Sequence, residues 1–307
     1  MRALASSARS ALVARTTKVM SLGYDEEATI LVSGSPRSGT TWLASSLSAL
    51  PSSAVLFEPL QLEHVPAARR AGFRWRTFVP PGRAWPEGER FLRRVFSGRV
   101  LNGWTAREIA IPRRVETWIV KCVRTNRLLP WIAERFNFRR PLLIVRHPCA
   151  VVASQLNRSW PADVGEADTE HPFGDRVNDF VASLPTVEER LAAVWALDTL
   201  VPLSSPHPWP WEMLCFEHLV RGGLDVLSGV FSNWGLSTPT GIAERLSRLS
   251  STADARTAGG DPVTSWRGRL SASQTRRILD VVRRLGIEIY DEDVMPKEPT
   301  AVSSPIL

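Results

Sequence analysis

Cysteine is scarce in this chain, which has three cysteines among 307 residues. Cys122, Cys149 and Cys215 show no metal-like spacing to one another or to any of the five histidines. This spacing argues against a disulfide framework, and it predicts a protein with no metal site that works in a reducing compartment.

Long apolar runs are also missing. No stretch approaches the roughly 18 residues that a membrane-spanning helix needs, so we expect no transmembrane segment and a cytoplasmic location. Residues 1–20 contain four basic residues and no acid. They indicate a frayed N-terminal tail, a helix that makes weak contact with a membrane surface, or a transit-like leader.

The composition is otherwise that of a globular protein, with 44% hydrophobic and 22% charged residues. The net charge of +7 favours anionic partners. Nucleotides, nucleic acids, acidic glycans and anionic membranes all fit this charge, and the charge alone does not distinguish these classes of partner.

Short apolar runs alternate with helical patterns along the chain. Strands are expected at 29–33, 54–57, 117–123, 141–145 and 211–216, and helices at 40–50 and 148–158. Two further helices open with capping boxes, Thr186 to Glu189 and Ser271 to Gln274, and residues 159–185 are expected to form a long loop. The alternation predicts an α/β fold, in which a mostly parallel sheet carries helices on both faces. We place a single domain at 29–290, with tails at 1–28 and 291–307.

The strongest local motif is S-G-S-P-R-S-G-T-T-W at residues 33–42, which leaves an apolar strand and enters a helix. Small residues there allow backbone N–H groups to surround an anion at a helix N-terminus. Thr40 stands where the ATP-binding P-loop has its lysine, and the cation is Arg37, inside the loop. The motif therefore favours a donor whose transferred group carries less charge than a γ-phosphate.

A second motif, R-H-P-C-A-V-V-A-S at residues 146–154, follows the strand at 141–145. The planar guanidinium of Arg146 and the hydroxyl of Ser154 suit a monophosphate group. We expect His147 to orient the turn beside Arg146. Two anion sites at adjacent strand ends predict a ligand with two separated phosphates.

Together these motifs resemble those of sulfotransferases that use 3′-phosphoadenosine 5′-phosphosulfate (PAPS). F-E-H-L-V at 216–220 and S-W-R-G-R-L-S at 265–271 are similar to later segments of that family. The resemblance implies a P-loop-type fold, PAPS as the donor, no metal, and transfer to a hydroxyl group. It also implies a set of donor-binding residues: Arg37, Ser38, Gly39, Thr40 and Thr41 for the phosphosulfate, Trp42 for adenine, Arg146 and Ser154 for the 3′-phosphate, and Trp266 and Arg267.

The catalytic base is expected to be Glu58. One branch of the family uses a histidine after the middle strand, but V-K-C-V-R-T at 120–125 contains none. L-F-E-P-L at 56–60 resembles the carbohydrate sulfotransferases, which implies Glu58 as the base in a bacterial member of the family. The alternatives are a structural role for Glu58 and His64 as the base.

The acceptor side is less defined. Residues 69–99 contain nine arginines together with Trp75 and Trp85, and Trp104 follows. These residues indicate either a site for a carbohydrate or glycoconjugate, or a solvated basic face whose indoles lie in the core. A P-loop small-molecule kinase is the alternative activity. Nucleic-acid binding is a third possibility, but no nucleic-acid motif supports it, and we expect no such partner.

Overall fold

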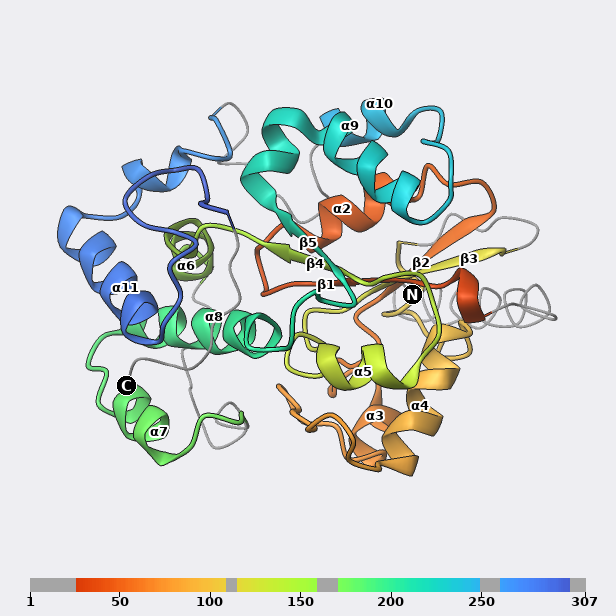
Figure 1. The fold of residues 1–307 in the computed structure, drawn as a ribbon, viewed down its shortest axis with the longest axis horizontal. Helices are drawn as coiled ribbons and strands as arrows, with labels where there is room; N and C mark the ends of the chain where they lie inside the picture. Colours follow the sequence, from red (N-terminus) through yellow and green to blue (C-terminus); the bar gives the residue numbers. More distant parts are fainter. Residues whose placement is uncertain (1–25, 109–114, 159–170, 249–259, 299–307) are drawn as a thin grey trace, which may run out of the picture.

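The computed structural model describes residues 26–108, 115–158, 171–248 and 260–298. Its centre is a sheet of five strands in the order β2-β3-β1-β4-β5, and all four neighbouring pairs are parallel (Figure 1). The strands are β1 (Ile30–Ser33), β2 (Ser53–Phe57), β3 (Thr117–Lys121), β4 (Leu142–Val145) and β5 (Glu212–Cys215). The predicted strands are confirmed, with ends that differ by a few residues.

Both faces of the sheet are buried, which explains the nearly continuous apolar runs of the strands. In β1, Ile30 and Val32 pack into one core cluster, whereas Leu31 packs into the other. Leu142 and Leu143 of β4 divide between the clusters in the same way. Alternate residues of each strand therefore reach opposite helical layers.

The helices cover both faces, as predicted (Figure 1). One layer holds α2 (Thr40–Leu47), α9 (Phe216–Asn233) and α10 (Ile242–Ser247). The other side holds α3 (Pro66–Arg70), α4 (Pro86–Phe96), α5 (Leu129–Arg135), α6 (Pro148–Leu156), α7 (Asp175–Ala182), α8 (Val187–Leu203) and α11 (Ala272–Arg284). Two short 3₁₀ turns, η1 (Glu26–Ala28) and η4 (Ser265–Gly268), complete the described elements. The expected α/β fold class is confirmed.

Both capping boxes are present, at Thr186 with Glu189 and at Ser271 with Gln274. Burial of helix α8 is not limited to one face. Val187 is exposed, and the helix is buried on all sides from Leu191 to Leu203, because it packs against α5, α6 and α11.

The expected loop at 159–185 is wrong over its second half, where α7 forms. Three residues of α7 are buried in the core: Val177, Phe180 and Val181. This apolar pattern is too short to be recognised as helical periodicity in the sequence. Residues 159–170 and the basic segment 1–20 lie outside the described residues. No helix within the described parts of the chain is long and apolar enough to cross a membrane.

Candidate functional site

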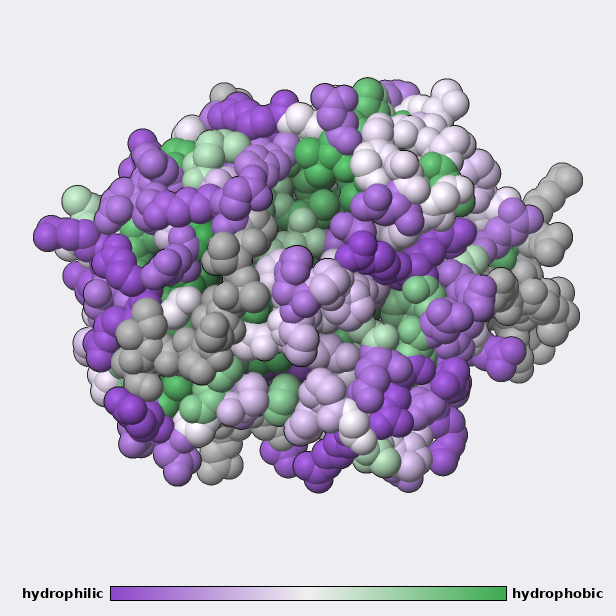
Figure 2. Space-filling model, viewed as in Figure 1, coloured by the Kyte–Doolittle hydropathy of each residue, from purple (hydrophilic) through white to green (hydrophobic). Residues whose placement is uncertain are grey.

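A cavity of about 890 Å³ opens beyond the carboxyl ends of the strands. Parallel α/β sheets bind ligands at this edge, because the loops and helix N-termini that follow the strands gather there. The loop after the central strand β1 lies in the middle of the cavity. The segments after β4 and β5 lie on one side of it, and those after β2 and β3 on the other. In the view of Figure 2, apolar residues line a hollow beside α9 in a mostly hydrophilic surface.

The β1 loop depends on two glycines. A Cβ atom on Gly34 would lie 2.4 Å from the Ile144 carbonyl oxygen. Gly39 has φ 97°, and a Cβ there would lie 2.6 Å from Cδ2 of Phe216. Arg37 also has a positive φ of 77°, which is uncommon for a residue with a side chain. The loop is therefore closely fitted to its neighbours and turns sharply into α2.

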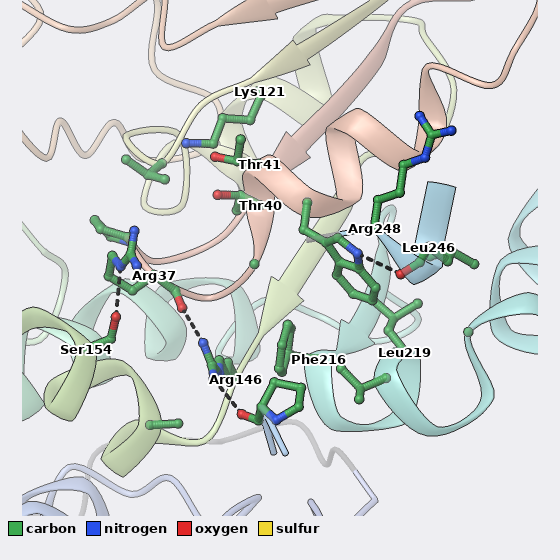
Figure 3. A pocket seen from close by; sticks show the side chains of 18 of the residues that line it. Arg37, Thr40, Thr41, Lys121, Arg146, Ser154, Phe216, Leu219, Leu246 and Arg248 are labelled. Carbon is green, nitrogen blue, oxygen red and sulfur yellow. Dashed lines mark hydrogen bonds between the residues drawn. The ribbon is translucent and has the colours of Figure 1, made fainter. Parts of the chain in front are cut away.

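Helix α2 begins at Thr40, and its first residues line the cavity. The side chains of Thr40 and Thr41 point to the same side as the Lys121 ammonium group (Figure 3). The first N–H groups of a helix have no partner within the helix, and its dipole favours negative charge there. Backbone N–H groups, two hydroxyls and one ammonium group thus form a surface that is suited to an anion.

A second cationic group lies beside this surface. Arg37 Nε donates to Ser154 Oγ at 2.9 Å. Arg146 donates from Nη1 to the Arg37 carbonyl at 3.1 Å and from Nη2 to the Pro262 carbonyl at 2.7 Å (Figure 3). Its guanidinium lies over the ring of Phe216, 4.2 Å from the centroid. Arg146 Nε is buried and has no hydrogen-bond partner in the described residues, so one charged N–H is left unpaired.

The Arg146 guanidinium remains charged near neutral pH. Burial lowers its pKa to about 10; neighbouring Glu217 opposes this shift, and Arg37 adds to it. Burying a charge costs free energy. An anionic partner for the unpaired N–H would offset this cost through a charge-assisted hydrogen bond.

A buried network holds the turn that carries this arginine. His147 N donates to Glu217 Oε1 at 2.9 Å, and the Tyr290 hydroxyl donates to Glu217 Oε2 at 2.7 Å. His147 Nδ1 accepts from Cys149 N at 3.2 Å, and Trp266 stacks on the imidazole. Burial lowers the pKa of His147 to about 4, so the ring is neutral at pH 7. His147 thus orients the turn, as expected.

The side of the cavity near β5 is apolar. Trp42 and Phe216 meet edge to face with centroids 5.6 Å apart, and Trp42 Nε1 donates to the Leu246 carbonyl at 3.0 Å. Further apolar side chains extend this surface: Leu219, Val220, Leu224 and Ala243. It lies next to both cationic groups and suits a flat aromatic ring.

Nine of the eleven predicted site residues line the cavity. The two exceptions are Ser38 and Arg267. The Ser38 hydroxyl is buried and has no partner among the described residues, and the Arg267 side chain instead donates from Nη2 to the Glu292 carbonyl at 2.8 Å. Arg269, which the sequence analysis did not select, lines the cavity.

Glu58, at the end of β2, also lines the cavity, and 4% of its surface is exposed. Its carboxylate forms an ion pair with Lys121 Nζ and accepts from Arg124 Nη1 at 3.2 Å. It also accepts from Val123 N, at 3.2 and 3.3 Å to its two oxygens. To receive a proton from a ligand, Glu58 has to exchange one of these donors. Its role as a base stays a prediction. His64 is exposed, and its ring stacks on that of Trp104 with the two centroids 4.0 Å apart.

Sequence reasoning missed Lys121 and Arg124. Their signal was a cation at the end of a buried strand and another three residues later, in V-K-C-V-R. This signal gained meaning only when pairing of β2 with β3 placed Glu58 beside them.

The tryptophans near the arginine-rich stretch are in contact with protein groups. Trp85 packs on Phe73 and Trp131, and the Arg124 guanidinium lies 4.6 Å from the Trp75 ring centroid. The Trp104 ring, which lines the cavity, contacts His64 and Arg107. This arrangement matches the alternative of a basic face whose indoles pack within the protein.

The lining is strongly cationic. Its described residues include one acid, Glu58, against eight cations: Arg37, Arg107, Lys121, Arg124, Arg146, Arg158, Arg248 and Arg269. Low-dielectric walls strengthen such a field, so the cavity is suited to a ligand with several negative charges. Within the described residues no group of three His, Cys, Asp or Glu side chains is placed to hold a metal ion.

Comparison with known proteins gives structural similarity only. No family model matches the chain. No curated protein matches it either. Among solved structures, the sulfotransferase domain of the Synechococcus PCC 7002 olefin synthase is 16% identical with a TM-score of 0.47, over 85% of this chain and 95% of that domain. The sulfotransferase domain from the curacin biosynthetic pathway is 18% identical with a TM-score of 0.44, over 85% and 99%.

Mouse sulfotransferase SULT7A1, in complex with PAP, is 13% identical with a TM-score of 0.41, over 87% of this chain and 88% of the mouse protein. Similarity at this level does not define a function.

Proposed function

We propose that this protein transfers a sulfuryl group from PAPS to a hydroxyl group of an acceptor. The observation that carries the proposal is that two neighbouring cationic groups lie next to an apolar surface in one cavity. One group is the N-terminus of α2 with Lys121, and the other is Arg146 with Ser154. PAPS has the matching parts, namely a phosphosulfate, an adenine ring and a 3′-phosphate.

The residues fit this donor. Backbone N–H groups at Gly39, Thr40 and Thr41 would hold the 5′-phosphosulfate, while Arg37 and Lys121 neutralise its charge. The buried Nε of Arg146 and the hydroxyl of Ser154 would bind the 3′-phosphate. The ribose, which carries both phosphates, would lie between these groups, and the adenine ring would lie beside them, against Trp42 and Phe216.

When bound, PAPS supplies an activated sulfuryl group, whose bond to the bridging phosphate oxygen breaks as the acceptor oxygen bonds to sulfur. Arg37 and Lys121 stabilise the charge that develops on that phosphate. Glu58 takes the proton of the acceptor hydroxyl after Lys121 or Arg124 moves from its carboxylate to a ligand.

The hydroxyl acceptor is proposed to be a carbohydrate or glycoconjugate, because Leu56–Leu60 resembles the carbohydrate branch. Its binding would depend on polar and charged groups rather than on stacking. The indole rings of Trp75, Trp85 and Trp104 are already in contact with protein side chains.

The residues suit a kinase less well. Thr40 stands where a P-loop kinase has its lysine, and Glu58, the one acid among the described lining residues, is engaged by two cations. Mg²⁺ bound to a nucleotide is held by a carboxylate as well as by a loop hydroxyl, and Thr40 and Thr41 supply only hydroxyls.

Calorimetry with 3′-phosphoadenosine 5′-phosphate (PAP), the desulfated product, tests the donor site. We expect saturable binding, and transfer of ³⁵S from labelled PAPS that EDTA does not inhibit. Absence of PAP binding would refute the proposal, and transfer of label from ATP would establish the kinase instead.

Glu58→Gln tests the base. We expect turnover to fall by at least about 10²-fold, the usual contribution of a general base, while PAP affinity stays within about threefold. Glu63→Gln is the matched control, because Glu63 is an exposed carboxylate five residues away. Thermal unfolding of both variants checks that loss of the ion pair with Lys121 does not unfold the protein. Near-normal turnover of a folded Glu58→Gln variant excludes Glu58 as the base.

A further inference from the structure

The half of the cavity over β2 and β3 lies on the other side of the β1 loop from Arg146 and Phe216. The proposed donor occupies the β1, β4 and β5 side and reaches this half only with its sulfuryl group. The remaining space, which the acceptor would fill, is lined by Phe57, Glu58, Gln61, Trp104, Arg107 and Arg124.

This half carries more positive than negative charge. Arg107, Lys121 and Arg124 line it, and Glu58 is the one acid among its described residues. Glu58 is shared by Lys121 and Arg124 and therefore balances only one of the three cations. Arg107 Nε lies 3.6 Å from Glu108 Oε1. A third of the Arg107 side chain is exposed, so salt and solvent screen this contact strongly.

Buried polar atoms in the same half lack partners in the described parts of the chain. Arg124 Nε and Trp104 Nε1 are donors without an acceptor, and Gln61 Oε1 is an acceptor without a donor. Unpaired buried polar groups are costly, so side chains like these, gathered along one cavity wall, indicate the chemistry of a ligand. A carboxylate would supply an acceptor for such donors, and a hydroxyl would supply a donor for the amide oxygen.

The position of Arg107 is fixed by two aromatic rings. Its guanidinium lies 3.5 Å from the Phe57 ring centroid and 4.4 Å from that of Trp104. Such contacts leave the edge of the guanidinium open to bind an anion, and they reduce the side-chain entropy that binding would cost.

We infer that the acceptor carries a carboxylate close to its reacting hydroxyl, and that Arg107 and Arg124 bind this carboxylate while the hydroxyl faces Lys121 and Glu58. This inference rests on the proposed sulfuryl transfer and not on the choice of a carbohydrate, and it identifies the acceptor as a hydroxylated organic acid. A sugar acid and an aromatic hydroxy acid share this chemistry.

Binding of acids and of their uncharged amides to the PAP-saturated protein tests the inference, because the donor anion sites are then filled. The probes are glucuronate with glucuronamide, and 4-hydroxybenzoate with 4-hydroxybenzamide. We expect at least one acid to bind about tenfold or more tightly than its amide, as a charge-assisted hydrogen bond predicts. The pair that shows the difference distinguishes a sugar acid from an aromatic acid.

Arg107→Gln should abolish this preference and leave PAP affinity unchanged. Arg94→Gln is the matched control, because Arg94 is an exposed arginine of α4 that does not line the cavity, and it removes the same charge. If Arg107→Gln fails to fold, Arg124→Lys, which removes the Nε donor but keeps a charge, should reduce the preference instead.

The outcomes separate the two proposals. If PAP does not bind, the proposed function fails and the acceptor inference fails with it. If PAP binds but the acids bind no more tightly than the amides, only the acceptor inference is overturned. An equal loss in Arg107→Gln and Arg94→Gln also overturns it, because the preference would then come from the net charge of the protein.

Discussion

Replacing Arg146 with alanine separates recognition of the 3′-phosphate from the rest of donor binding. Arg146 lies directly after β4, with two of its nitrogens bonded to the carbonyls of Arg37 and Pro262. The third, Nε, is buried without a partner among the described residues, and it is the atom that we assign to the 3′-phosphate.

The magnitude follows from this single open donor. A hydrogen bond to a charged group is worth about 1.5–3 kcal/mol, which corresponds to about a 10- to 150-fold change in Kd. Loss of the two carbonyl contacts loosens the β1 loop, and it weakens every nucleotide that binds there by a similar factor. The ratio of PAP affinity to adenosine 5′-phosphate affinity therefore isolates the 3′-phosphate contribution.

Calorimetric titration of both nucleotides into wild type, Arg146→Ala and Arg146→Lys measures this ratio. We expect it to fall at least about tenfold in Arg146→Ala and less in Arg146→Lys, which keeps a positive charge. Arg94→Ala, an exposed arginine outside the cavity, controls for net charge. An unchanged ratio in a folded Arg146→Ala variant would refute the assignment of Arg146, whatever the absolute affinities.

Three further outcomes are expected. Asp198→Asn removes the carboxylate that pairs with Arg127 at 2.9 Å, where 1% of each side chain is exposed, and urea titration should show about 3–5 kcal/mol less stability. Gly39→Ala forces a Cβ into Phe216 at φ 97°, so PAP affinity should fall at least about tenfold while circular dichroism stays unchanged; normal affinity would contradict the fitted loop. The pKa of His147 is about 4 in the folded protein, against about 6.5 when unfolded, so the unfolded chain binds the extra proton as pH falls through this window. This one group should lower the free energy of unfolding by about 2 kcal/mol between pH 7 and pH 5, and folded His147→Gln should show a smaller loss.

Patterns that are local in sequence predicted most of the framework. The five strands are short apolar runs because helices cover both of their faces, and that burial is visible residue by residue. The capping boxes at Thr186 and Ser271 need only residues three positions apart. The β1 loop can be recognised in the sequence because positions of close approach and positive φ require glycine, as Gly34 and Gly39 show.

Contacts between distant segments depended on the order of the strands, which local patterns do not contain. Arg37 meets Ser154 across 117 residues because β4 lies next to β1. Glu58 meets Lys121 across 63 residues because β2 pairs with β3. The sequence by itself thus determined the fold class, the anion-binding loop and most of the candidate residues. Only the tertiary structure decided that Glu58 lies between two cations, that Arg267 lies away from the cavity, and that Arg107 is held on Phe57, because each of these depends on which strand ends and loops become neighbours.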